Sequence, residues 1–180
     1  LFRSEKLCEV FKFWAEAFKR VRLFVIESSL KQLEIEVNSN LTSLGLVGWT
    51  VKFDVERENK SGGITKGFVT LVIPPDAQAP ARYETYSGGE KQRLRLAGDF
   101  GLANLIMEQA GLNSTIEFYD EASAGLSITG QTDLADALAE RASAFGRVIF
   151  YVDHNSLDYG GYAGLLIAFK AKEGAALRWR

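Results

Sequence analysis

The sequence predicts an α/β protein in which a long amphipathic helix and a β-hairpin precede a parallel βαβ core. Residues 1–38 lack proline and glycine, and their apolar residues recur at three- and four-residue steps, as on one face of a helix. Residues 49–73 alternate between apolar and polar side chains, as in half-buried strands. From residue 87 onward the order is helix, strand, helix, strand, which favours a parallel sheet.

The first element is the helical stretch at the N-terminus. Its apolar stripe consists of Leu7, Val10, Phe11, Trp14, Phe18, Val21 and Val25, and its opposite face carries Lys12, Glu16, Lys19 and Arg20. The stripe blurs over residues 22–30, which predicts a bend and a second helix over 28–43 that ends near Gly45. We therefore expect two units, 1–45 with the helices and 46–180 with the α/β domain.

A hairpin comes next. Apolar residues alternate from Trp49 to Val55, turn-forming residues occupy 59–63, and a second strand covers 68–73 before Pro74-Pro75 ends it. A loop then leads to residue 87. The last segment, 164–180, predicts a closing hairpin that turns at Glu173-Gly174.

Two helices and two short apolar strands make up the predicted core. The first helix covers 88–109 and ends near Gly111; the second covers 129–144 and is capped by Thr129 or Thr132. The strands lie in STIEFYDEAS and VIFYVDH, and we expect both to be buried neighbours in a parallel sheet.

Composition narrows the class of protein. The chain has 180 residues, 47% apolar residues and a net charge of −2, which suits one globular domain and provides no overall basic field for nucleic acid. Cys8 is the only cysteine, so no intramolecular disulfide is possible and a reducing compartment is expected. The sequence has no run of about 18 apolar residues, so no membrane-spanning helix is predicted.

Ser87-Gly88-Gly89-Glu90 begins the helix of the core and has two interpretations. Serine followed three positions later by glutamate is a capping box. The glycine pair is unfavourable for a helix, but it lets a ligand approach the free amides closely. Because the N-terminus of a helix attracts anions, the same four residues also suit a phosphate site.

The two strands each end in residues capable of chemistry. Asp120 and Glu121 follow the first strand; in a parallel sheet this is the edge where ligands bind. An aspartate there can hold Mg²⁺, and the adjacent glutamate can orient or deprotonate a water. His154, the only histidine, ends the second strand. The alternatives are a solvated acid pair and a structural or surface histidine.

Four segments in this order resemble the motifs of ABC-type ATPases. YSGGEKQR resembles the signature motif, TIEFYDEAS the Walker B strand with its catalytic glutamate, SAGLS the D-loop and FYVDH the switch-histidine strand. The form of the signature motif found here, Ser-Gly-Gly-Glu-Lys-Gln-Arg, is similar to that of SMC-like DNA repair ATPases. The N-terminal segment KFWAEAFKRVRLFVIESSLKQLE resembles the coiled-coil exit of the SbcC-type subunit of the recombination nuclease, including bacteriophage versions. Two positions depart from the pattern: Ala122 stands where proline is usual, and Ser127 stands where the D-loop has aspartate.

The resemblance implies the C-terminal lobe of an ATPase head. No phosphate-binding P-loop, Gly-x-x-x-x-Gly-Lys-Ser/Thr, occurs in the chain, so an N-terminal Walker A lobe is expected to supply it, and this lobe alone is expected to be inactive. By resemblance, ATP and Mg²⁺ are the cofactors. Ser87, Gly88, Gly89 and Glu90 would close on the γ-phosphate held by a second copy, Asp120 would hold Mg²⁺, Glu121 would position the attacking water, and His154 would contact the γ-phosphate.

The resemblance also implies partners. A head-to-head homodimer, DNA and a metallophosphoesterase-type nuclease are the expected partners. The nuclease would contact Phe11, Trp14 and Phe18, for which the alternative is core packing. DNA phosphates would contact Lys19, Arg20 and Arg22, for which the alternative is a solvated helix face. The expected location is the cytoplasm, in association with the nucleoid. If a phage encodes the chain, this is the cytoplasm of the host cell. The expected function is that of the C-terminal half of an ATP-hydrolysing head, belonging to a DNA double-strand-break repair and recombination ATPase that dimerises on ATP and controls the partner nuclease. The alternatives are a chromosome-organising SMC head acting as a tether, a transporter ATPase, and an α/β domain without nucleotide chemistry.

Overall fold

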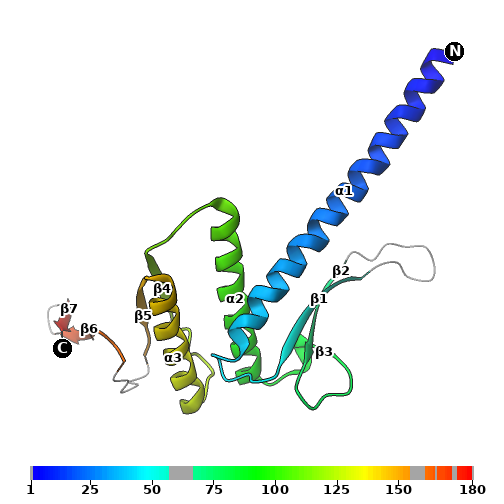
Figure 1. Cartoon of the computed structure of the whole chain (residues 1–180). Helices are drawn as coiled ribbons and strands as arrows, with labels where there is room; N and C mark the ends of the chain where they lie inside the picture. Colours follow the sequence, from blue (N-terminus) through cyan, green and yellow to red (C-terminus); the bar gives the residue numbers. More distant parts are fainter. Residues whose placement is uncertain (1, 57–66, 155–160, 165, 172–173, 180) are drawn as a thin grey trace.

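The computed structural model describes residues 2–56, 67–154, 161–164, 166–171 and 174–179. Its elements confirm the predicted α/β architecture of helix, antiparallel hairpin and parallel strands. Figure 1 shows a long helix that projects from one end of the molecule, with the two shorter helices and two of the sheets near its C-terminal end and the C-terminal hairpin apart from them at the far left.

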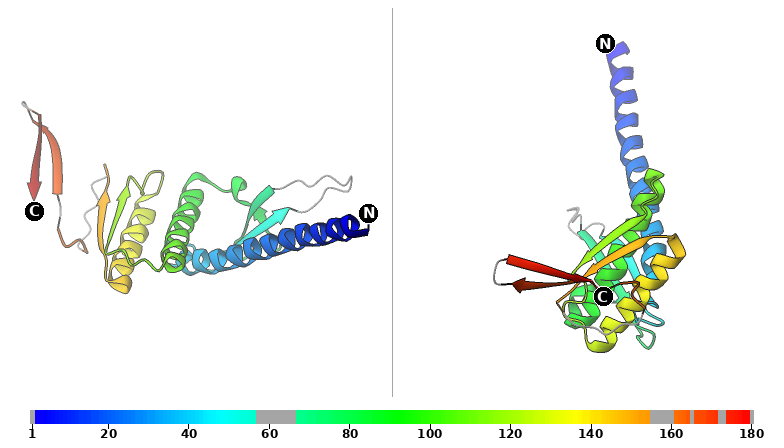
Figure 2. Two further views of the ribbon diagram at one scale, coloured as in Figure 1. Left: turned by 90° about the horizontal axis from the view of Figure 1, so that it is seen from above. Right: turned by 90° about the vertical axis from the view of Figure 1, so that its left-hand side faces the viewer.

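The projecting helix α1 (Phe2–Leu41) is continuous, so the predicted bend and second helix are wrong. No proline or glycine interrupts residues 22–30, and a blurred apolar stripe changes which face is covered without breaking the backbone. Only the C-terminal part of α1 is packed into the domain: Val37 and Leu41 are each 1% exposed, whereas Phe11 and Phe18 are 66% and 67% exposed. Figures 1 and 2 show the free part of the helix extending away from the other elements.

The predicted hairpin is confirmed. Strands β1 (Thr50–Glu56) and β2 (Gly67–Ile73) pair antiparallel, and Val51 lies opposite Val72, both buried. The turn predicted at 59–63 lies outside the described residues. A two-residue strand, β3 (Ala81–Arg82), adds to β2 within the predicted loop, because so short a strand leaves no periodic pattern to detect.

Both core helices have the expected type, and one has an unexpected cap. Helix α2 (Gly88–Ala110) follows the short 3₁₀ turn η1 (Tyr83–Thr85) and ends at Gly111, whose φ of 63° is left-handed. Helix α3 (Ile128–Phe145) is capped by Ser127 rather than by a threonine, because it begins one residue earlier than predicted and the Ser127 hydroxyl accepts from the Gly130 amide at 3.2 Å.

Strands β4 (Ile116–Asp120) and β5 (Val148–Val152) pair in parallel, as predicted. Residues of one face, Tyr119, Ile149 and Tyr151 among them, pack against the core. The other face is open: Ile116, Phe118, Val148, Phe150 and Val152 are 47–73% exposed. The expectation of fully buried strands is therefore wrong for the described part of this chain, because none of its elements covers the second face.

The closing hairpin is confirmed as β6 (Leu166–Ala171) and β7 (Gly174–Trp179), which pair antiparallel. Glu173 of the predicted turn lies outside the described residues. Figure 2 shows this hairpin at the end of the molecule opposite the N-terminus of α1.

Arg93 of α2 joins the three helices. Its Nη1 donates to the Leu44 carbonyl at 2.9 Å, just after α1, and pairs with the Asp133 carboxylate of α3 at 2.9 Å. Gly45, with φ of 75°, lies so close that an added Cβ would come 2.1 Å from Arg93 Nη1. The end of α1 is thereby fixed against both core helices.

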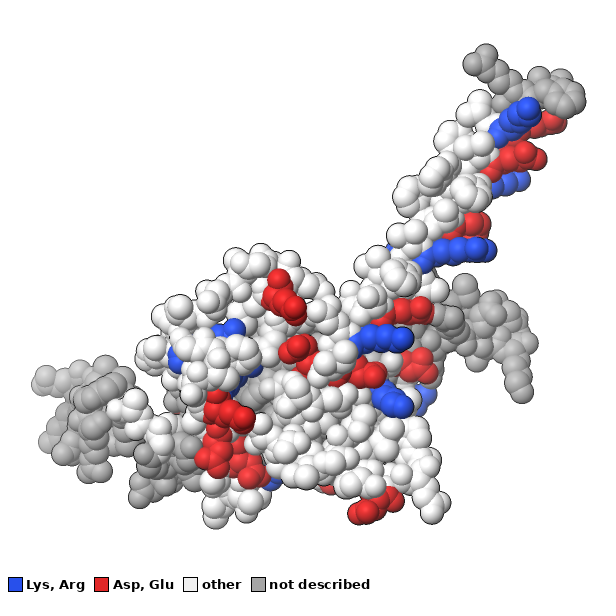
Figure 3. All heavy atoms as spheres, in the orientation of Figure 1, with Lys and Arg blue, Asp and Glu red and all other residues white. Residues whose placement is uncertain are grey.

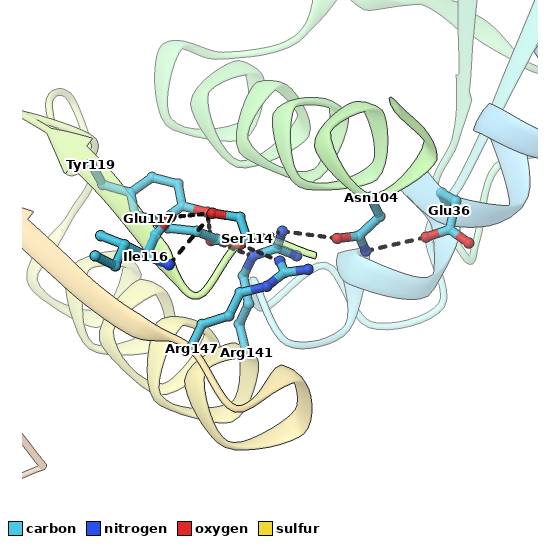
Figure 4. A network of polar contacts seen from close by, with 8 residues as sticks. All are labelled: Glu36, Asn104, Ser114, Ile116, Glu117, Tyr119, Arg141 and Arg147. Carbon is cyan, nitrogen blue, oxygen red and sulfur yellow. Dashed lines mark hydrogen bonds and ion pairs between the residues drawn. The ribbon is translucent and has the colours of Figure 1, made fainter. Parts of the chain in front are cut away.

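A buried polar chain also crosses the domain (Figure 4). Glu117 of β4 accepts from Arg141 Nε at 2.7 Å and from Arg147, and all three side chains are less than 10% exposed. Arg141 Nη2 donates to Asn104 of α2 at 2.8 Å, and Asn104 donates to Glu36 of α1 at 3.2 Å. Buried charges need such partners, so the position of β4 depends on contacts from all three helices.

Candidate functional site

The ends of β4 and β5 bring the predicted carboxylates and histidine together. The parallel register pairs Asp120 with Val152, so Glu121 and His154 lie just past the same edge of the sheet. His154 Nε2 lies 2.8 Å from Glu121 Oε1, with side chains that are 84% and 57% exposed. Both groups are therefore in contact with each other and open to a ligand.

Glu121 has an unusual backbone. Its φ of 50° is the one positive value at a non-glycine position among the described residues. Its amide donates to the Val152 carbonyl at 2.8 Å, which continues the β5 pairing while the chain turns away. Left-handed backbone at a non-glycine residue carries strain and occurs preferentially at functional sites.

The start of α2 has the capping box that its sequence indicates. The Ser87 amide and hydroxyl donate to Glu90 Oε2 at 2.9 and 2.7 Å, and the Ser87 hydroxyl accepts from the Glu90 amide at 3.4 Å. These hydrogen bonds from Ser87 lower the pKa of Glu90, so its charge is retained at the helix N-terminus. Gly88 is exposed, and an added Cβ there would meet nothing within 4 Å. The capping box and an open amide turn therefore coexist.

This turn lies against the loop that follows Glu121. An added Cβ at Gly89 would lie 3.6 Å from the Gly125 carbonyl, and Gln92 Nε2 donates to the Ala122 carbonyl at 2.9 Å. The N-terminus of α2 therefore lies on the side of the molecule where β4 and β5 end. Of the predicted site residues, the structure joins Glu121 to His154 directly and Ser87 to Glu90, and it connects the two pairs through this loop.

A second polar cluster at the same edge was missed by the sequence prediction. Asp153 Oδ2 accepts hydrogen bonds from the hydroxyls of Ser123 and Tyr151, and the Tyr151 ring stacks on Tyr162 at 6.4 Å between centroids. Ser123 is only 1% exposed. The one signal in the sequence was Asp153, an acid directly before the histidine, and the sequence alone does not indicate the partner of that acid.

Asp120 is the carboxylate predicted to hold Mg²⁺. Asp120 is exposed at the end of β4. Among the described residues there is no group of three or more histidine, cysteine or acidic side chains able to hold a metal. Mg²⁺ is commonly held by one or two carboxylates together with substrate phosphates and water. Asp120 fits a metal bound jointly with a nucleotide and does not suit an independent metal site.

No helix in the described part of the chain has the length and apolarity needed to cross a membrane. No protein-family model and no curated protein matches the sequence.

Solved structures of SMC heads share the fold. A structure from work on ATP-driven dimerization and DNA-stimulated activation of SMC ATPases is 15% identical, with a TM-score of 0.69 over 87% of this chain and 88% of that one. The Smc head with an extended coiled coil bound to the C-terminal domain of ScpA, from Pyrococcus furiosus, is 15% identical with a TM-score of 0.66 over 96% of this chain and 40% of its own. The SMC head domain of Thermotoga maritima is 15% identical, with a TM-score of 0.60 over 87% of this chain and 50% of its own.

This chain thus spans most of the first of these structures and half or less of the other two. At this identity the likeness concerns architecture. The chain has the mixed α/β fold of SMC ATPase heads, an ABC-class fold, with the acid pair and the histidine at the C-terminal edge of its parallel strands.

Proposed function

We propose that this chain is the C-terminal lobe of an ATP-hydrolysing head that dimerises on ATP and controls a partner nuclease in DNA double-strand-break repair. The observation that carries the proposal is the contact between Glu121 and His154, 2.8 Å apart, at the edge of the sheet whose following loop packs against the N-terminus of α2. The similarity of the fold to SMC heads supports the ATP-dependent part of the proposal. Its site of action is then the cytoplasm, near the DNA.

Each site residue has a role in this proposal. Gly88 and Gly89 present backbone amides to the γ-phosphate of a nucleotide bound to a second copy, and the Ser87 hydroxyl joins them when it turns from Glu90 toward the phosphate. Glu90 keeps that turn in place through the capping box. Asp120 holds Mg²⁺, which when bound neutralises phosphate charge.

Glu121 and His154 act on water and phosphate. The Glu121 carboxylate accepts a hydrogen bond from the attacking water and takes its proton as the bond to the γ-phosphorus forms and the bond to the β–γ bridging oxygen breaks. His154 Nε2 lies 2.8 Å from that carboxylate and orients it, and the exposed ring is the group that contacts the γ-phosphate in this proposal. The two side chains are more than half exposed, so closure by a second head would exclude water from them.

The open face of β4 and β5 supports the need for a second lobe. Parallel strands are normally covered on both faces. Phe118 and Phe150 stack across this face at 5.0 Å between ring centroids, yet they are 73% and 47% exposed. We propose that the lobe bearing the P-loop covers this face and thereby places its nucleotide at the edge where Glu121 lies.

The free part of α1 supports a coiled coil. Leu7, Phe11, Trp14, Phe18, Val21 and Val25 follow alternating steps of four and three residues and are 49–67% exposed. Such spacing forms the seam of a left-handed coiled coil. Figure 3 shows charged side chains gathered along one side of this helix, away from a largely uncharged side. We propose residues 1–45 as the coiled-coil base, with apolar residues outside the seam, such as Phe13, available to the nuclease.

The first experiment compares Gly88→Ala with Gly98→Ala in the complete head. Both glycines belong to α2, and at both an added Cβ meets nothing within 4 Å, so both variants are expected to fold. Only the methyl at position 88 would cover the exposed amides, so this variant is expected to lose ATP-dependent dimerisation and hydrolysis by about tenfold or more, about 1.4 kcal/mol. Equal activity of the two variants would refute the role of this turn.

The second experiment tests the reacting groups. Glu121→Gln is expected to bind ATP and accumulate as a dimer without turnover, as seen by size-exclusion chromatography and phosphate release. Hydrolysis at the wild-type rate would contradict the assignment. This lobe without the P-loop lobe is expected to hydrolyse essentially no ATP.

A second candidate is an SMC-type tether that does not control a nuclease. It is favoured by the structures compared, one of which carries the bound C-terminal domain of ScpA. Pull-down with a metallophosphoesterase subunit and with a ScpA-like protein distinguishes the two candidates, since each predicts binding to one bait.

A further inference from the structure

The cluster of Asp153, Ser123 and Tyr151 joins the two segments that carry the proposed reacting groups. Ser123 lies two residues after Glu121, and Asp153 directly precedes His154. The hydrogen bond from the Ser123 hydroxyl to Asp153 Oδ2 therefore links the loop after β4 to the end of β5, beside the contact between Glu121 and His154.

The backbone at this point makes such a link useful. Glu121 leaves β4 with a left-handed φ, and its amide hydrogen bond to the Val152 carbonyl extends the pairing with β5 one residue past the end of β4. The side chains of Glu121 and His154 are largely exposed, so packing against neighbouring side chains does little to fix their positions. The hydrogen bond of the buried Ser123, two residues after Glu121, restricts the loop that carries Glu121.

Tyr151 holds the same carboxylate from the strand. Its hydroxyl donates to Asp153 Oδ2, and its ring packs between the core and Tyr162. Burial, followed by the hydrogen bond to Asp153, raises the pKa of Tyr151, so the hydroxyl remains a donor at neutral pH. Two hydroxyls from different segments therefore fix one oxygen of Asp153.

We propose that Asp153, held by Ser123 and Tyr151, is a positioning residue that sets the distance between Glu121 and His154 for the attack of water. The inference rests on the proposed ATPase function. It assigns no contact with nucleotide to Asp153; the residue acts through the backbone of its neighbour His154 and through the loop that carries Glu121.

The fold provides a matched control. Tyr119 and Tyr151 are register partners in the parallel pair, on the same face of the sheet. Tyr119 donates to Glu117 two residues before it, at 2.6 Å, whereas Tyr151 donates to Asp153 two residues after it. Tyr119→Phe and Tyr151→Phe therefore remove equivalent hydroxyls, one directed toward the start of the strands and one toward the reacting edge.

The test is steady-state ATP hydrolysis by the complete head. Tyr151→Phe and Ser123→Ala are each expected to lower kcat between about 10-fold and 100-fold with little change in the KM for ATP, since misplaced reacting groups slow the chemical step without weakening binding. Tyr119→Phe is expected to keep kcat within about twofold of wild type. Asp153→Asn, which retains an oxygen acceptor, should retain more activity than Asp153→Ala.

A double-mutant cycle separates positioning from general destabilisation. If Tyr151 acts through Asp153, then Tyr151→Phe causes no further loss of kcat in the Asp153→Ala background. Equal kcat for Tyr119→Phe and Tyr151→Phe, or additive losses in the cycle, would overturn the inference. Failure of the proposed function is recognised separately, because then Glu121→Gln and His154→Ala would also leave hydrolysis unchanged.

Discussion

Replacement of Gly101 by alanine tests the contact through which the projecting helix meets α2. Gly101 is buried in α2, and an added Cβ would come 2.8 Å from the Val37 amide nitrogen and 3.0 Å from the Glu36 carbonyl carbon of α1. Both atoms belong to backbone, so the helices themselves would have to move apart. Gly98 lies one turn earlier in α2, where an added Cβ meets nothing within 4 Å.

The two glycines allow the packing contribution to be isolated. Replacing glycine by alanine within a helix stabilises it by about 1 kcal/mol, and this gain applies to both variants. Overpacking costs about 1–3 kcal/mol and applies only to Gly101→Ala. Gly98→Ala should therefore raise the free energy of unfolding by about 1 kcal/mol, and Gly101→Ala should be less stable than Gly98→Ala by about 1–3 kcal/mol.

Thermal unfolding followed by circular dichroism measures the difference. For a chain of this size 1 kcal/mol corresponds to about 2–4 °C, so the Tm values of the two variants should differ by about 2–12 °C. Wild type and Gly98→Ala serve as references for the propensity gain. The reasoning is refuted if Gly101→Ala is as stable as Gly98→Ala, because α1 and α2 would then not approach as closely as the structure has them.

Three further predictions concern buried charge, a helix cap and a tight turn. Burial by itself raises the pKa of Glu117, but hydrogen bonds from its arginine and tyrosine partners outweigh it and hold the pKa below 4.5. This stabilisation is present above about pH 4.5 and is lost as the pH falls through the lowered pKa. Denaturant titrations should therefore show that Glu117→Gln lowers the free energy of unfolding by about 3–5 kcal/mol at neutral pH and by less near pH 3. Ser127→Ala should lower the free energy of unfolding by about 1 kcal/mol and Ser127→Asp should not, because aspartate caps a helix as serine does; equal losses would contradict the cap. Gly45→Ala should lower Tm more than Gly146→Ala, since both glycines have positive φ but only at Gly45 does a Cβ meet an ion pair.

Local features were predictable where the deciding contacts are near in sequence. The capping box depends on residues three positions apart, and the end of α2 depends on a glycine able to adopt positive φ. The order of strands and helices predicted the parallel pair, and this in turn placed Glu121 and His154 at one edge. The cap of α3 was mistaken because several hydroxyl residues lie within a few positions of its start.

The sequence by itself determined the order of the elements and the chemical groups at the ends of the strands, because periodicity and capping are properties of short segments. Only the tertiary structure decided that α1 is one continuous helix, that one face of β4 and β5 is open, and that Asp153 meets Ser123 from 30 residues away. Such contacts depend on how elements pack in space, and the same apolar strand or acidic residue is compatible with several arrangements until its neighbours are fixed.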